Sequence, residues 1–143
     1  MEGGRTILLV EDNPMDVDLT LRAFARRRLS NAITVARDGQ EAIDLFAAWE
    51  LGEQIPVVIL LDVNMPKVGG LEVLRQLRAN PKFGRIPVVM LTTSAENQDI
   101  QTAYALGANS YIVKPVNFEK FLSVAEQIDL YWMVLNQTAT LGP

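Results

Sequence analysis

Acidic residues follow two apolar runs in this chain, and this position makes them candidates for a functional site. Glu11 and Asp12 come directly after the run 7–10, and Asp62 follows the longer run 55–61. A carboxylate at such a point lies where a buried strand leaves the core and meets water. If the two strand ends are neighbours, three carboxylates converge, and such a cluster is costly unless a cation neutralises it. A cation beside a free carboxylate indicates phosphoryl chemistry.

A hydroxyl and an amine follow two later apolar runs. Thr92 comes directly after the run 88–91, and Lys114 comes directly after 111–113. Asp62 is then the candidate nucleophile, because a carboxylate oxygen can attack phosphorus. The ammonium and the hydroxyl would offset negative charge on the phosphoryl oxygens. Positioning and electrostatics do most of the work in such a transfer, so no general base is required.

Magnesium is the cation that this set of oxygens favours, because Mg²⁺ binds carboxylate and carbonyl oxygens together with water. The expected ligands are Glu11, Asp12, Asp62 and the main-chain carbonyl of Asn64.

Composition excludes several other kinds of site. The chain has 143 residues, without histidine or cysteine, which removes imidazole chemistry, disulfides and zinc–thiolate sites. The net charge is −4, and the sequence contains no basic stripe that could bind the phosphates of a nucleic acid. No apolar stretch reaches the roughly 18 residues that span a bilayer, and no signal sequence precedes the first strand. We therefore expect a cytoplasmic protein with no nucleic-acid or membrane partner.

The elements that must position these residues alternate along the chain. Strands are predicted over 6–10, 32–36, 57–61, 88–91 and 111–113, each followed by a helical pattern. Five such units indicate an α/β fold in which a five-stranded parallel sheet is doubly wound by helices on both faces. In such sheets ligands bind at the carboxyl ends of the strands, where the polar residues above lie. The third strand is apolar throughout and is expected at the centre.

Capping residues mark the expected helix boundaries. The predicted starts are at Asn13 before Pro14, at Asp38 with Glu41, at Thr93 with Glu96, and at Asn117. Gly107 is expected to end the fourth helix. The last helix is predicted to carry an apolar stripe from Phe118 to Trp132.

These residues together resemble the response-regulator receiver domain, of the chemotaxis-regulator type, over residues 5–136. The match lies in order and spacing: Glu11-Asp12, Asp62 with Asn64-Met-Pro66, Gly69-Gly70, Thr92, Tyr111 and Lys114-Pro115. Two departures are a Glu-Asp pair in place of Asp-Asp, and Val63 where the chemotaxis protein has a bulky aromatic residue.

The resemblance implies a flavodoxin-like receiver fold and a role in a two-component phosphorelay. Asp62 would accept a phosphoryl group from a sensor histidine kinase, with Mg²⁺ bound by the acidic pair. Thr92 and Tyr111 would reorient on phosphorylation and switch a protein-interaction surface. The bond between Lys114 and Pro115 would be cis. Such a protein catalyses only its own phosphorylation and dephosphorylation, and we expect a single domain over 1–143 without an output domain, in which 137–143 form a polar tail.

A narrower resemblance points to stand-alone regulators of phytochrome-type histidine kinases. It rests on the segments 9–14 and 111–118, and on Tyr131-Trp132 with Leu135-Asn136. The stretch 130–135 is apolar on nearly every side of the last helix and must therefore be covered on more than one face. We predict a homodimer through the last helix, strand five and the fourth helix, with Tyr131, Trp132 and Leu135 in the interface. Local packing of the tail is the alternative.

Three other functions fit part of the pattern. A haloacid-type phosphohydrolase also forms an aspartyl phosphate, but it would need a second acid where this chain has Asn64. A flavodoxin-like FMN module would need a first loop rich in Ser, Thr and Gly, whereas Glu11-Asp12 would repel a phosphate. The third is a receiver that acts as an interaction module without phosphate.

Overall fold

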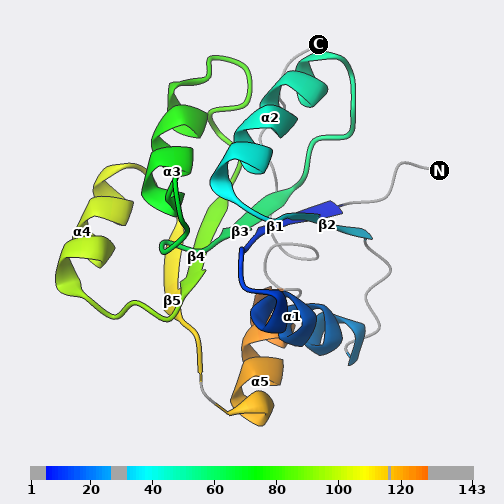
Figure 1. The fold of residues 1–143 in the computed structure, drawn as a ribbon, viewed down its shortest axis with the longest axis vertical. Helices are drawn as coiled ribbons and strands as arrows, with labels where there is room; N and C mark the ends of the chain where they lie inside the picture. Colours follow the sequence, from blue (N-terminus) through cyan, green and yellow to red (C-terminus); the bar gives the residue numbers. More distant parts are fainter. Residues whose placement is uncertain (1–5, 27–31, 116, 129–143) are drawn as a thin grey trace.

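Five parallel strands form one sheet in the order β2-β1-β3-β4-β5 (Figure 1). The computed structural model describes residues 6–26, 32–115 and 117–128. The strands are β1 (Thr6–Val10), β2 (Ala32–Ala36), β3 (Val58–Leu61), β4 (Val88–Thr92) and β5 (Ser110–Val113). Every neighbouring pair is parallel, so all the strands end at the same edge of the sheet.

Five helices cover the two faces of this sheet. They are α1 (Pro14–Arg26), α2 (Gly39–Glu50), α3 (Gly70–Ala79), α4 (Asn97–Ala105) and α5 (Phe118–Ile128). Helices α1 and α5 pack together on one face, while α2, α3 and α4 lie on the other (Figure 1). The predicted doubly wound architecture is confirmed.

Alternating strand residues supply two separate cores. In β3, Ile59 and Leu61 face the core under α2, α3 and α4, and Val58 and Leu60 face the core under α1 and α5. All four side chains are buried, with at most 1% of their surface exposed. A strand that is apolar on both sides therefore lies at the centre, as its sequence predicts.

The expected caps hold at three helices and fail at one. Asn13 accepts hydrogen bonds from the main-chain N–H groups of Met15 and Asp16, and Asn117 accepts one from Lys120. At α2, Asp38 accepts from Glu41 N–H. The Glu41 carboxylate accepts from the N–H of Arg37, one residue before the expected partner.

Thr93 does not cap α4, and that prediction is wrong. The residue that precedes α4 is Glu96, which makes no side-chain cap, and the helix begins at Asn97. In the loop before α4, the Ser94 hydroxyl instead donates a hydrogen bond to the carboxylate of Asp99, in the first turn of the helix. Gly107 does end α4, with a φ of 101° that favours glycine.

The predicted interface residues and the predicted polar tail 137–143 lie outside the described residues. The expected interface residues Tyr131, Trp132 and Leu135 follow the last described residue of α5. Within the described ranges, no helix is long and apolar enough to cross a membrane.

Candidate functional site

The carboxyl ends of β1 and β3 are held side by side. Val10 is aligned with Leu61, and the N–H of Asp62 donates to the carbonyl of Val10 over 3.1 Å. Glu11 and Asp62 therefore leave the sheet as the next residues of two adjacent strands. The spatial condition on which the sequence argument depended is met.

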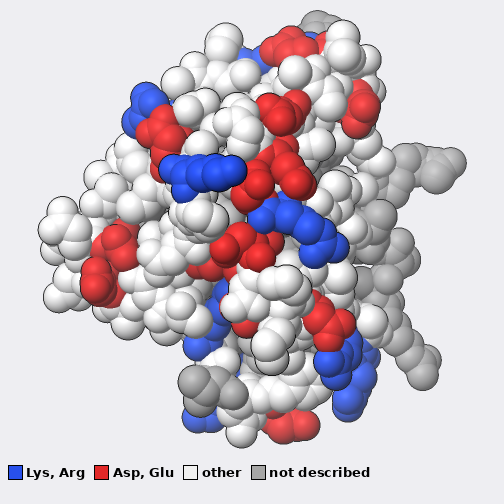
Figure 2. All heavy atoms as spheres, viewed as in Figure 1, with Lys and Arg blue, Asp and Glu red and all other residues white. Residues whose placement is uncertain are grey.

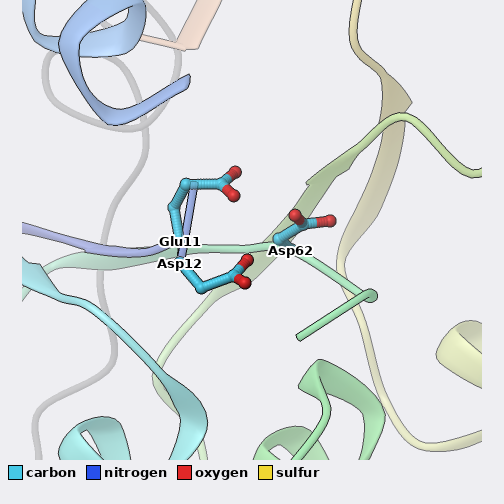
Figure 3. A group of neighbouring side chains, drawn as sticks. All are labelled: Glu11, Asp12 and Asp62. Carbon is cyan, nitrogen blue, oxygen red and sulfur yellow. The ribbon is translucent and has the colours of Figure 1, made fainter. Parts of the chain in front are cut away.

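Three carboxylates converge at this point. One oxygen of each of Glu11, Asp12 and Asp62 lies within 4.8 Å of the others, and their side chains open toward a shared space (Figure 3). Carboxylate oxygens are the ligands that Mg²⁺ prefers in proteins. The donor set, all oxygen and all anionic, fits a divalent cation.

Glu11 carries the clearest electrostatic cost of this arrangement. Only 2% of its side chain is exposed. Burial raises the pKa of Glu11 from 4.5 to about 7, although its hydrogen bond to Lys114 and the charge of Lys114 offset part of the rise. A buried carboxylate in this position favours either a proton or a nearby cation.

Lys114 extends from the end of β5 into the same cluster. Its ammonium group donates to Glu11 and to Asp16, the latter over 3.1 Å, and it lies 3.9 Å from Oδ2 of Asp62. Burial opposes the charged form, but the hydrogen bond and charge of Glu11 outweigh it and raise the pKa of Lys114 above its ordinary value. The lysine is therefore a fixed positive charge beside the acids.

Thr92 and Tyr111 meet at the main chain of Ser94. Thr92 is fully buried at the end of β4, and its hydroxyl oxygen accepts the N–H of Ser94 over 3.2 Å. The Tyr111 hydroxyl, from β5, donates to the carbonyl of Ser94 over 2.9 Å. One loop residue thus links the candidate phosphoryl-binding hydroxyl to the candidate switch aromatic.

The loop after β3 bends tightly around Asp62. The N–H of Asn64 approaches Oδ1 of Asp62 at 3.4 Å, and Gly70 N–H donates to the carbonyl of Val63. A Cβ atom on Gly70 would lie 1.9 Å from the carbonyl oxygen of Asp62. Glycine is therefore required at position 70 for close approach, whereas Asn64 points outward and is exposed.

The peptide bond between Lys114 and Pro115 is trans, and the expectation of a cis bond is wrong. No peptide bond is cis in the part of the chain that the structure describes. Trans is the more stable isomer even before proline. The N–H of Lys114 donates to the carbonyl of Thr92 over 2.7 Å.

Asp16 is the member of this cluster that the sequence analysis did not identify. It lies in the first turn of α1, and its carboxylate is 31% exposed where it contacts Lys114. The position of Asp16 in the sequence could have indicated this contact. Helix α1 begins at Pro14, directly after Glu11 and Asp12, so its first turn passes close to the strand ends. Figure 2 shows several acidic side chains near the centre of the face in view, with basic side chains beside them and further acidic side chains toward the rim.

The chain matches the family described as the response regulator receiver domain over residues 7–126. It belongs to that family. The receiver domain is 41% identical over 133 residues to the probable methanogenesis regulatory protein FilR2 of Methanothrix harundinacea, covering 92% of this chain and 86% of FilR2. It is 34% identical over 139 residues to the response regulator Rcp1 of Synechocystis sp., covering 96% and 92% of the two chains.

Solved structures of similar receiver proteins have the same fold. The phosphorylated cyanobacterial phytochrome response regulator RcpA superposes with a TM-score of 0.89 at 34% identity, covering 96% of this chain and all of RcpA. The Mn²⁺-bound form of Rcp1 gives a TM-score of 0.85 at 32% identity, covering 95% and 99%. Membership in this family favours the signalling interpretation over the hydrolase and FMN alternatives, and the acidic cluster fits a divalent metal ion.

Proposed function

We propose that this receiver domain accepts a phosphoryl group on Asp62 from the phosphohistidine of a sensor histidine kinase. The observation that carries the proposal is the surroundings of Asp62. This carboxylate is 7% exposed, with Glu11 and Asp12 on one side and the ammonium of Lys114 at 3.9 Å. Such a carboxylate is almost buried and faces both a candidate cation site and a fixed positive charge.

The proposed transfer uses each of these groups once. An oxygen of Asp62 forms a bond to phosphorus while the bond from phosphorus to the histidine nitrogen of the donor breaks, and the imidazole leaves with its electron pair. Lys114 offsets charge on one phosphoryl oxygen, and the Thr92 hydroxyl donates a hydrogen bond to another. Mg²⁺ would be held by Glu11, Asp12, Asp62 and the main-chain carbonyl of Asn64, and it supplies charge neutralisation when bound.

The proposed switch runs from Thr92 to Tyr111. When Thr92 turns toward the phosphoryl group, its hydroxyl oxygen no longer accepts the hydrogen bond from Ser94 N–H. The carbonyl of the same Ser94 accepts the hydrogen bond from the Tyr111 hydroxyl. Tyr111 then moves and the surface over α4 and β5 changes. Phosphorylation shifts the population between two arrangements of this region and leaves the fold intact.

The proposed partners follow from the relatives. RcpA is a phytochrome response regulator, which supports a phytochrome-type histidine kinase as the phosphodonor of this chain. We place the exchange in the cytoplasm, where such a kinase draws on ATP. Within residues 1–143 the protein acts as one domain, and it works as a phosphoacceptor, not as an enzyme that turns over an external substrate. A homodimer through the last helix and β5 is part of the proposal.

Intact mass measurement after incubation with acetyl phosphate and Mg²⁺ tests this function. We expect an increase of about 80 Da, the mass of a phosphoryl group that replaces a proton. Asp62→Asn or EDTA should abolish the increase, whereas Asp44→Asn, a change of an exposed acid on α2, should leave it intact. Unchanged mass of the wild-type protein, or equal labelling of Asp62→Asn, would contradict the proposal.

A further inference from the structure

Asp16 lies in this site but is not one of the residues on which the resemblance to receiver domains rests. It lies in the first turn of α1, and Oδ2 accepts a hydrogen bond from Nζ of Lys114 at 3.1 Å. The lysine side chain is 6% exposed and the aspartate side chain 31%, so Asp16 lies on the more exposed side of the buried ammonium.

The ammonium of Lys114 has three N–H donors, and the carboxylates around it lie at different distances. Glu11 and Asp16 accept two of them. Oδ2 of Asp62 lies at 3.9 Å, beyond hydrogen-bond distance. The ammonium therefore donates hydrogen bonds to two other carboxylates, while its contact with Asp62 is a longer ion pair without a hydrogen bond.

We propose that Asp16 is a positioning residue for phosphoryl transfer. The inference rests on the function proposed above: Asp16 and Glu11 hold Lys114 so that it faces an incoming phosphoryl group without donating a hydrogen bond to Asp62. A hydrogen bond from Lys114 to Asp62 would engage a lone pair that must attack phosphorus. The carboxylate of Asp16 prevents this by giving the ammonium a competing anion.

Asp16 matters most when a cation is bound. Glu11 is a candidate cation ligand as well as a partner of Lys114, so its oxygens are shared between two positive groups once the ion is present. Asp16 does not belong to the cluster of three carboxylates. It therefore remains as the carboxylate that keeps Lys114 in place.

The test compares two neighbouring aspartates of α1. Asp16→Asn removes the charge that holds Lys114, while Asp18→Asn removes the same charge from a side chain that is 59% exposed and pairs with Arg22. We expect Asp16→Asn to lower the rate of phosphorylation by acetyl phosphate by about two- to fivefold, in line with the loss of a partly exposed ion pair. Asp18→Asn should keep the wild-type rate, and Asp16→Glu should recover most of it.

Two further measurements separate positioning from general damage. Calorimetric titration with Mg²⁺ alone should give the same affinity for Asp16→Asn as for the wild type. In a Lys114→Gln background, which is slow in itself, adding Asp16→Asn should cause no further loss of rate, because the residue acts through the lysine. Thermal unfolding of each variant confirms that it is folded.

The contrary results are distinct. An unchanged rate for Asp16→Asn, an equal loss in the Lys114→Gln background, or a parallel fall in Mg²⁺ affinity would each overturn the positioning role. Failure of the wild-type protein to gain any phosphoryl group would instead overturn the proposed function, and it is detected before any variant is compared.

Discussion

The proton and the metal ion compete for Glu11. Burial raises its pKa to about 7, so the carboxyl group is protonated through much of the acidic range. A cation must displace that proton before it can use the oxygen as a ligand. We predict that Mg²⁺ affinity falls as the pH decreases below about 7, by up to about tenfold per pH unit, and levels off above it.

Calorimetric titrations with Mg²⁺ between pH 5.5 and 8 measure this dependence. The Glu11→Gln variant keeps a ligand oxygen but loses the titrating group, so its affinity should be weaker and nearly flat near pH 7. A wild-type affinity that is constant over the same range would contradict the prediction.

At the residue scale, the sequence predicted most of the side chains that the structure brings together at the strand ends. Glu11, Asp12, Asp62, Thr92 and Lys114 each follow a run of apolar residues, and the parallel sheet gathers the ends of those runs. The contact of Asp16 with Lys114 was not predicted. It depends on the direction in which the first turn of α1 leaves β1, and the pattern of residue types does not contain that direction. The trans bond at Lys114 was missed because the expectation came from the family and not from local chemistry.

The loop between β3 and α3 is the element on which Asp62 depends. Gly70 begins α3 directly against the main chain of Asp62, where an added Cβ would lie 1.9 Å from the carbonyl oxygen. We predict that Gly70→Ala destabilises the fold by about 1–3 kcal/mol, as overpacking does, and slows phosphorylation because Asp62 is displaced.

Gly69→Ala is the matched control in the same loop. A Cβ at position 69 would have its nearest neighbour at 3.4 Å, an ordinary contact, and its φ is −76°. Thermal unfolding and acetyl phosphate labelling should therefore be close to wild type for this variant. Equal effects of the two substitutions would show that the close approach at Gly70 is not the cause.

Helix ends were harder to predict than helices. The apolar runs placed the five described strands to within one residue at each end. Thr93 was assigned a cap because the loop after β4 contains several residues that can cap. Arg78 is a further example of a contact that pattern reasoning does not reach. Its guanidinium donates to the carbonyls of Gly84, Ile86 and Gly107, which joins the loop before β4 to the turn before β5.

The molecule as a whole has two cores separated by the sheet, and this layout was readable from the sequence. Alternation along β3 sends Ile59 and Leu61 to one side and Val58 and Leu60 to the other. The strand order could be expected only by analogy, because the apolar runs of strands 1, 3 and 4 do not say which neighbours which.

Self-association is the whole-molecule property that the last segment of the chain predicts. The apolar stretch 130–135 lies beyond the described residues, and its composition requires cover on more than one side. We predict a dimer in light scattering, and a shift toward monomer in Trp132→Glu or Leu135→Glu. Leu51→Glu serves as the control, because Leu51 is 87% exposed at the end of α2, away from the proposed interface. A wild-type monomer would remove the dimer from the proposal.

The ion pair between Glu11 and Lys114 joins positions 103 residues apart. During synthesis the three acids are all made by residue 62, but their lysine emerges only with the fifth strand. A nascent or truncated chain can thus bring its acids together without the ammonium that completes the pocket. On the function proposed above, we therefore expect phosphorylation only of molecules in which the first and fifth strands have both taken their places in the sheet.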